Sequence, residues 1–150
     1  MIVVESLFLE ESNISFLDPC TKEEAIITLV KSISSKIDGK EREVIEKILE
    51  REAIVPTAIG RSIAIPHGRC PFLEEFSIAI GVISGEGIAW DAMDYEGVKI
   101  ICLIAGPADK PSKYLTFLSH ITSVLRKEQF RHKILNECDK KTIVNIFRSC

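Results

Sequence analysis

Two apolar segments of strand length constrain the fold of this chain most strongly. They read Phe-Ser-Ile-Ala-Ile-Gly-Val-Ile-Ser at 76–84 and Val-Lys-Ile-Ile-Cys-Leu-Ile-Ala at 98–105, and turn signals at 85–87 and 94–97 lie between them. Segments this apolar, rich in isoleucine and valine, are typical of strands that other elements cover on both faces. We therefore expect a sheet with helices packed on each side.

An amphipathic helix is predicted before these strands. Thr21 and Glu24 form a capping-box pattern, which marks the start of a helix. Apolar residues then recur at helical spacing. They are Ala25, Ile26, Leu29, Val30, Ile33 and Ile37. The pair Asp38–Gly39 is expected to end this helix, and a second helix is predicted over 40–52.

The helical period returns after residue 107. The next helix is expected to bury a stripe of mainly apolar residues. These are Leu115, Leu118, Ile121, Thr122 and Leu125. Two shorter helices are predicted over 129–136 and 140–147. Together the elements predict an α/β fold: a single-domain sandwich over residues 1–150, in which helices flank a mixed β-sheet.

Composition narrows the class of protein. The chain has 150 residues, about one domain, and its 19 basic and 22 acidic residues give a net charge of −3, which argues against general nucleic-acid binding. Its longest strongly apolar stretch, 100–105, is far shorter than the ~20 residues of a membrane-spanning helix, so no membrane insertion is expected. The five cysteines are odd in number and widely spaced. We therefore expect no disulfide framework and a cytoplasmic location.

His67 is the first candidate for chemistry. It follows a short β-type segment at 61–65 that Pro66 is expected to end, because proline lacks a hydrogen-bond donor and biases the residue before it. Gly68 lets another part of the chain approach closely. A neutral imidazole at such a strand end could accept a phosphoryl group. Taken alone, however, the pattern favours an ordinary hydrogen-bonded or exposed histidine.

A longer sequence pattern around His67 favours a functional histidine over an ordinary one. The stretch from Glu52 through Ile59–Gly60 to the segment 63–68, Ile-Ala-Ile-Pro-His-Gly, resembles the active-site signature of phosphotransferase-system EIIA domains of the fructose/mannitol class. The resemblance continues at Thr57 in the loop before the histidine, in Gly-Ile-Ala-Trp at 87–90, and in Pro-Ala-Asp at 107–109. It covers residues 7–147 and leans toward the nitrogen-regulatory branch of the family.

The resemblance implies a specific chemistry. The histidine that matches His67 takes a phosphoryl group from a phosphohistidine on HPr, or on an HPr-like carrier of the nitrogen branch. The arginine that matches Arg51 lies beside it, and a guanidinium suits the added negative charge. We expect a backbone carbonyl to orient the ring nitrogen of His67 that stays unphosphorylated. Members of the sugar branch pass the group on to an EIIB domain.

Two positions depart from the family pattern. Many members carry a second active-site histidine where this chain has Tyr114. A tyrosine hydroxyl can hydrogen-bond a phosphate, but its ordinary pKa of about 10 makes it a poor titratable base. Tyr114 therefore weakens the expectation that the protein passes a phosphoryl group on more than the expectation that it accepts one. This favours a phosphoryl group that serves as a signal. Ala58 stands where glycine is usual and narrows the conformations open to the loop.

Two cysteine and histidine patterns carry less weight. His67 and Cys70 are spaced like two metal ligands, but no second pair accompanies them, so we expect no metal site and no cofactor. For Cys70, an ordinary loop cysteine is favoured over a redox-active one. His120 lies in the wrong register to replace the missing histidine, and His132 is expected to be exposed.

The aromatic residues Trp90 and Tyr95 could anchor a partner, although Trp90 is expected to pack beside the sheet. Three functions stay open: a phosphoryl carrier of the EIIA type, a regulator that docks on a target according to the state of His67, and an interaction domain that is not phosphorylated. Because His67 and Arg51 are present, the third is disfavoured. The chain carries no EIIB or permease segment, which favours the regulator over sugar transport.

Overall fold

The computed structural model describes residues 9–90, 96–136 and 139–148. The secondary structure begins with a 3₁₀ turn, η1 (Glu11–Asn13). Six short strands follow in the order of the chain: β1 (Ile14–Leu17), β2 (Ala58–Gly60), β3 (Ile63–Ala64), β4 (His67–Arg69), β5 (Ser77–Ile83) and β6 (Ile100–Gly106). The helices are α2 (Lys22–Ser32), η2 (Ser34–Lys36), α3 (Glu41–Ile54), α4 (Pro111–Arg126), α5 (Glu128–Asn136) and α6 (Lys140–Arg148).

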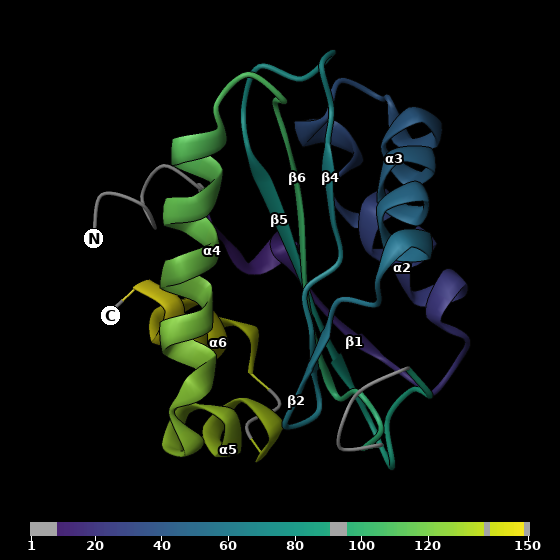
Figure 1. The fold of residues 1–150 in the computed structure, drawn as a ribbon. Coiled ribbons are helices and arrows are strands. Elements are labelled where there is room, and N and C mark those ends of the chain that lie inside the picture. Colours follow the sequence, from purple (N-terminus) through teal and green to yellow (C-terminus); the bar gives the residue numbers. More distant parts are fainter. Residues whose placement is uncertain (1–8, 91–95, 137–138, 149–150) are drawn as a thin grey trace.

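The strands form one mixed sheet, as predicted. Its order is β1-β5-β6-β3-β2, and β4 also pairs with β6. Strands β5 and β6 are antiparallel, whereas β1 runs parallel to β5, and β3 and β4 run parallel to β6. Figure 1 shows the sheet between two layers, with α2 and α3 on one side and α4, α5 and α6 on the other. The α/β sandwich is therefore confirmed.

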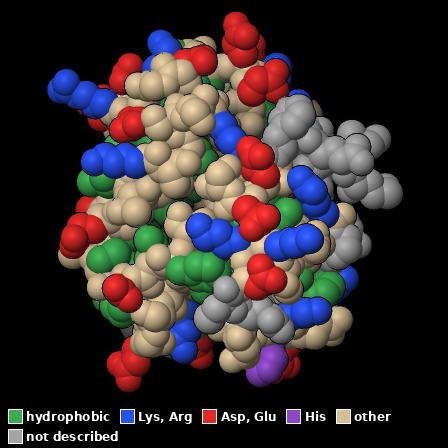
Figure 2. Space-filling view, turned by 180° about the vertical axis from the view of Figure 1, so that it is seen from behind, with side chains coloured by type: hydrophobic (Ala, Val, Ile, Leu, Met, Phe, Trp, Pro, Cys, Tyr) green, Lys and Arg blue, Asp and Glu red, His purple; other side chains and the backbone are tan. Residues whose placement is uncertain are grey.

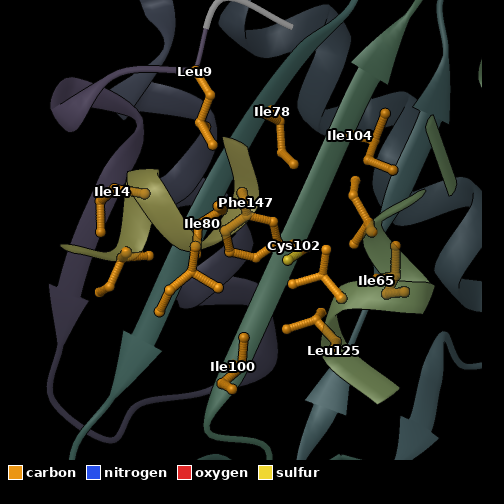
Figure 3. Packing of buried hydrophobic residues seen from close by; sticks show 14 of the residues in the cluster. Leu9, Ile14, Ile65, Ile78, Ile80, Ile100, Cys102, Ile104, Leu125 and Phe147 are labelled. Carbon is orange, nitrogen blue, oxygen red and sulfur yellow. The ribbon is translucent and has the colours of Figure 1, made fainter. Parts of the chain in front are cut away.

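The two apolar segments are the centre of this sheet. All residues of β5 and β6 are buried. Side chains alternate between the two faces: Ile80 and Cys102 join the core under α4 and α6, while Leu103 joins the core under α2 and α3. Figure 3 shows Phe147 of α6 lying over Ile80 and Cys102. Because helices cover both faces of the sheet, every side chain of these two strands is buried, and this explains their continuously apolar sequence.

The first helix begins as predicted but ends early. The Glu24 backbone N–H donates to Thr21 Oγ1 at 3.1 Å, and the Thr21 N–H donates to Glu24 Oε1 at 3.3 Å, which completes the capping box. The helix stops at Ser32, and the 3₁₀ turn η2 carries the chain on to Asp38 and Gly39, whose φ angles are 54° and 70°. Ile33 and Ile37 of the predicted stripe are buried nonetheless. The following helix runs two residues beyond its predicted end at 52.

The predicted face of α4 is right at Ile121 and Leu125, which are buried, and at Leu118, which packs partly buried against the core, but it is wrong at Leu115. Leu115 is 60 % exposed, and Tyr114 and Phe117 are buried in its place. The cause is aromatic packing: Phe117 meets Phe76 edge-to-face, with ring centroids 4.8 Å apart. At this end of the helix, Phe117 therefore takes the buried position that was predicted for Leu115.

Two further details of the strands differ from expectation. The edge strand β1 was not predicted, because only Ile14 of its four residues is fully buried and no alternation stands out. The segment predicted over 61–65 is a turn followed by a strand. Arg61 and Ser62 have φ angles of 57° and 66° and connect β2 to β3. None of the described helices is long and apolar enough to cross a bilayer.

Gly68 fixes the distance between β4 and α3. A Cβ at this position would lie 2.9 Å from Cγ1 of Ile48 and 3.2 Å from the Ile48 backbone nitrogen. The absence of a side chain therefore lets α3 lie directly against the strand that starts at His67.

Gly68→Ala is expected to lower the free energy of unfolding by about 1–3 kcal/mol, because the added methyl group overpacks this contact. Urea denaturation measures the loss. In an Ile48→Ala background, which removes the nearest atom, the same substitution should cost clearly less. An equal cost in both backgrounds would show that the contact with α3 is not the cause.

Candidate functional site

His67 lies at an interruption of one sheet edge. Strands β3 and β4 both pair with β6, and Ile65–Pro66 separates them. The strand was expected to end at Pro66, and β3 does end before it, but pairing resumes at His67, the first residue of β4. The break turns the half-buried imidazole toward the surface beside α3 and α4, where it borders two hollows.

One ring nitrogen of His67 is held by the backbone. Nδ1 lies 2.9 Å from the carbonyl oxygen of Ile65. Since a carbonyl oxygen can only accept, Nδ1 carries the proton in the neutral ring and Nε2 keeps its lone pair. The expected contact between a ring nitrogen and a backbone carbonyl is therefore present, and it selects Nε2 as the nucleophilic atom.

The environment of His67 favours the neutral ring. Burial lowers its pKa below the ordinary 6.5, the hydrogen bond to Ile65 and the charge of Glu52 act in the opposite direction, and the charges of Arg51 and Arg69 lower the pKa further. A nucleophile that must be unprotonated gains from this shift.

We expect His67 to be more than half neutral at pH 6.5, where an ordinary imidazole is half protonated. The acid limb of any reaction at Nε2 should then lie below pH 6.5. NMR titration of the ring protons measures the pKa directly. Arg51→Gln removes one lowering charge and should move the pKa upward, and a wild-type value at or above 6.5 would contradict the prediction.

Arg51 lies beside His67, as expected. It belongs to the last turn of α3, and its Nη1 donates to the carbonyl oxygen of Val55 at 2.8 Å. Arg51 and His67 together border both hollows. The first, about 520 Å³, lies between the β2–β3 hairpin and α4, and the second, about 570 Å³, contains Arg69 and Tyr114.

Tyr114 is brought to the site by the first turns of α4. Its ring centroid is 5.4 Å from that of His67, and the Arg69 guanidinium lies 5.6 Å from it over the ring face. Burial raises the pKa of Tyr114 to about 12, so the hydroxyl stays neutral. This hydroxyl is buried and has no hydrogen-bond partner in the part of the chain that the structure describes. It is a donor available to a group that enters the site.

Thr57 is buried, and its side chain binds Glu52. Its Oγ1 donates to Glu52 Oε1 at 2.5 Å, and its backbone N–H donates to Glu52 Oε2 at 2.8 Å. The indole N–H of Trp90 donates to the same Oε2 at 3.0 Å. Trp90 thus packs beside the sheet, as predicted. Sequence reasoning recognised Glu52 only as part of a signature, since its partner Trp90 lies 38 positions away on a separate turn.

The remaining residues that the sequence singled out lie away from the site around His67 or take no part in it. Cys70 is buried, and burial raises the pKa of its thiol to about 11, which opposes the reactive thiolate. His120 Nε2 lies 3.1 Å from the carbonyl oxygen of Phe147, and His132 is exposed. Tyr95 lies outside the described residues. Within those residues, no three His, Cys, Asp or Glu side chains gather as metal ligands would.

Exposed apolar side chains lie around the two hollows, beside the charged residues already described. Ile54, Ile59 and Leu115 are 76 %, 52 % and 60 % exposed and border the two hollows, and Val55 follows Ile54. We call these four residues the docking rim. On the face of the molecule that is seen from behind Figure 1, basic and acidic side chains are interspersed (Figure 2).

The sequence of residues 7–150 matches the profile of a family described as "Phosphoenolpyruvate-dependent sugar phosphotransferase system, EIIA 2". The chain belongs to this family. A fructose-specific EIIA component from Haloferax volcanii is 32 % identical to this EIIA protein over 130 residues, which are 85 % of this chain and 83 % of the relative. A nitrogen regulatory protein from Bradyrhizobium diazoefficiens is 27 % identical over 143 residues, 95 % of this chain and 93 % of the relative.

Solved structures agree on the fold of this EIIA protein. The nitrogen regulatory protein IIA-Ntr from Neisseria meningitidis superposes with a TM-score of 0.88 at 21 % identity, covering 98 % of this chain and 99 % of the other. The mannitol IIA of Escherichia coli gives 0.76 at 20 % identity, covering 93 % and 98 %. The predicted family and fold are both confirmed, and relatives from the regulatory and the sugar branches are represented.

Proposed function

We propose that this EIIA protein accepts a phosphoryl group on Nε2 of His67 from a phosphohistidine of HPr or an HPr-like carrier. The observation that carries the proposal is the Nδ1 contact with Ile65, which leaves the lone pair on Nε2 of a half-buried imidazole that borders two surface hollows. The lone pair attacks phosphorus and forms a new P–N bond. The P–N bond to the donor histidine breaks, and its electron pair returns to that ring. We propose a cytoplasmic location, because a carrier of this kind and its phosphoenolpyruvate supply act there.

Arg51 is proposed to stabilise the transferred group. A phosphoryl group adds a charge of about −1.5 to −2, and Arg51 and Arg69 are the cations whose charges reach His67. The Arg51 guanidinium donates to Val55 through Nη1. Its other N–H groups can bind the equatorial oxygens of the phosphoryl group in the loose transition state. The unpartnered Tyr114 hydroxyl is proposed as an additional donor to the same oxygens. Thr57 is proposed to act indirectly: its two hydrogen bonds to Glu52 hold the loop between α3 and β2 in place.

The docking rim is proposed to receive the carrier protein. Large apolar side chains at the surface of a soluble domain, placed around a reactive group, favour contact with another protein. A donor whose own phosphohistidine must reach Nε2 needs such a surface immediately around His67.

Leu115→Ser is expected to lower the second-order rate constant of phosphorylation by about tenfold, the loss that is usual for an apolar anchor. The rate at saturating carrier should change little, because Leu115 is not placed at the phosphoryl group. Stopped-flow measurements over a range of HPr concentrations separate the two parameters. Phe16→Ser is the matched control, since Phe16 is 43 % exposed on the far sheet edge. Equal effects of the two substitutions would contradict docking at the rim.

We infer that the phosphoryl group serves as a signal rather than as cargo. Tyr114 replaces a titratable histidine with a neutral hydroxyl, and the relatives include nitrogen regulatory proteins. The alternative is a sugar-specific EIIA that passes the group to a separate EIIB or permease. It is favoured by the fructose-specific relative, and one similar structure is a complex of mannitol EIIA with phosphorylated EIIB. Rapid transfer from the phosphorylated protein to a cognate EIIB would establish this alternative.

A third candidate is an interaction module that is never phosphorylated. The presence of both His67 and Arg51 disfavours it.

Incubation with phosphoenolpyruvate, enzyme I and HPr tests the proposal. Intact-mass measurement should show one added phosphoryl group that is labile in acid and stable in alkali. No labelling by any cognate HPr would overturn the carrier function and leave the interaction module. Pull-downs with His67→Asp and His67→Ala then identify a target that distinguishes the two states.

A further inference from the structure

Glu52 is buried in the last turn of α3. Its side chain is 4 % exposed, and its two oxygens receive three hydrogen bonds: two from Thr57 and one from Trp90. A buried carboxyl group is costly unless it is well bonded, so its presence here calls for an explanation.

A continuous series of hydrogen bonds leads from Glu52 to the reactive ring. Glu52 holds both the backbone N–H and the hydroxyl of Thr57. The Thr57 carbonyl oxygen accepts from the Ile65 N–H at 3.1 Å. The Ile65 carbonyl oxygen in turn accepts from Nδ1 of His67 at 2.9 Å. Thus Ile65, which orients the imidazole of His67, is itself held by Thr57, and Glu52 fixes Thr57.

We propose that Glu52 is a positioning residue for His67: through Thr57 and Ile65 it fixes the ring in the tautomer that keeps the lone pair on Nε2. The consequence for phosphorylation rests on the proposed function, but the effect on the ring does not. Trp90 completes the arrangement, because its indole N–H holds Oε2 in place from the turn at 87–90.

The chemistry of the contacts identifies a conservative replacement. Both groups that face Oε2 are N–H donors, so this oxygen must accept. Oε1 faces a hydroxyl, which can donate or accept. In Glu52→Gln, the amide oxygen can occupy the Oε2 position, and the amide NH₂ can donate to a rotated Thr57 hydroxyl. Every hydrogen bond is then kept, and only the charge is lost.

Glu52→Leu has a similar size but no acceptor. It leaves the Thr57 N–H and the Trp90 indole N–H buried and unpaired, so the loop must move to reach water. The Ile65 carbonyl then loses its fixed orientation, and His67 is expected to populate both neutral tautomers. A misplacement of about 1 Å can cost two orders of magnitude in rate, so phosphorylation by HPr should slow by roughly tenfold to hundredfold.

The experiment measures the ring of His67 by ¹⁵N NMR in the unphosphorylated protein, together with the initial phosphorylation rate. Wild type and Glu52→Gln should show one tautomer, with the proton on Nδ1, and rates within about threefold of each other. Glu52→Leu should show ring ¹⁵N shifts averaged between tautomers. Asn13→Leu is the matched control: Asn13 is also buried, donates to the Ile78 carbonyl at 2.7 Å and lies near the far sheet edge. It should lose stability without changing the ring of His67.

If Glu52→Leu fails to fold, Thr57→Val removes one of the two bonds to the loop and should give an intermediate mixture of tautomers. A wild-type tautomer in Glu52→Leu, or in a folded Thr57→Val when Glu52→Leu is unfolded, would overturn the proposal. So would an equal change in Asn13→Leu. If wild type shows the Nδ1–H tautomer and Glu52→Leu loses it, but HPr labels neither, the positioning role stands and the proposed function fails.

Discussion

His67→Ala is expected to abolish phosphoryl transfer to this protein completely. Neither of the other two histidines is placed to replace it, because His120 is held against the Phe147 carbonyl and His132 is an exposed residue of α5 that borders neither of the hollows beside Arg51. Intact-mass measurement after prolonged incubation with phosphoenolpyruvate, enzyme I and HPr should show only the unmodified mass.

His132→Ala provides the control and should incorporate one phosphoryl group at the rate of the wild type. The fold should survive in His67→Ala, because the imidazole is only half-buried and its backbone pairing with β6 does not depend on the side chain. Phosphate that persists in His67→Ala would place the acceptor elsewhere and would remove the basis of the proposed function.

Arg51→Ala is expected to slow phosphorylation by roughly 10²–10³-fold, the usual cost of losing one preorganised group that stabilises transition-state charge. In free energy this is about 3–4 kcal/mol of transition-state stabilisation. Arg51→Lys should recover only part of the rate, because an ammonium is a point charge and lacks the planar fork. Rapid-quench measurement at saturating HPr reports the step directly.

Arg42→Ala is a matched control on the same helix. Arg42 lies at the other end of α3, is 90 % exposed, and has an ion-pair contact of 3.6 Å with Glu46. Its loss should leave the rate unchanged within about twofold, because exposed pairs contribute little. If Arg51→Ala and Arg42→Ala slow the reaction equally, general attraction of the carrier, rather than a contact with the phosphoryl group, would explain both.

The parts of the fold that the sequence predicts are those with strong local signals. The capping box at Thr21 and the apolar character of β5 and β6 depend on neighbouring residues and on burial of both faces, and the structure confirms them. On α4, the burial of Phe117 in place of Leu115 was missed because both residues are apolar, so periodicity alone does not choose between them. The choice is made by the fit of Phe117 against Phe76, a contact between distant segments.

The same distinction applies to the site. The position of His67 beside Arg51 follows from a signature that spans a helix end and the next strands. The contact between Glu52 and Trp90 joins residues that are 38 positions apart, and no spacing rule links them. The tautomer of His67 depends on where the Ile65 carbonyl points after Pro66, which only the folded chain fixes.

The central claim is that Nε2 of His67 carries the phosphoryl group while Nδ1 stays bonded to the Ile65 carbonyl. ³¹P and ¹⁵N NMR of uniformly ¹⁵N-labelled protein, phosphorylated by HPr, tests it most directly. The prediction is a single phosphohistidine with the phosphorus coupled to Nε2 and with a protonated Nδ1. A phosphoryl group on Nδ1, or on any residue other than His67, would contradict the claim.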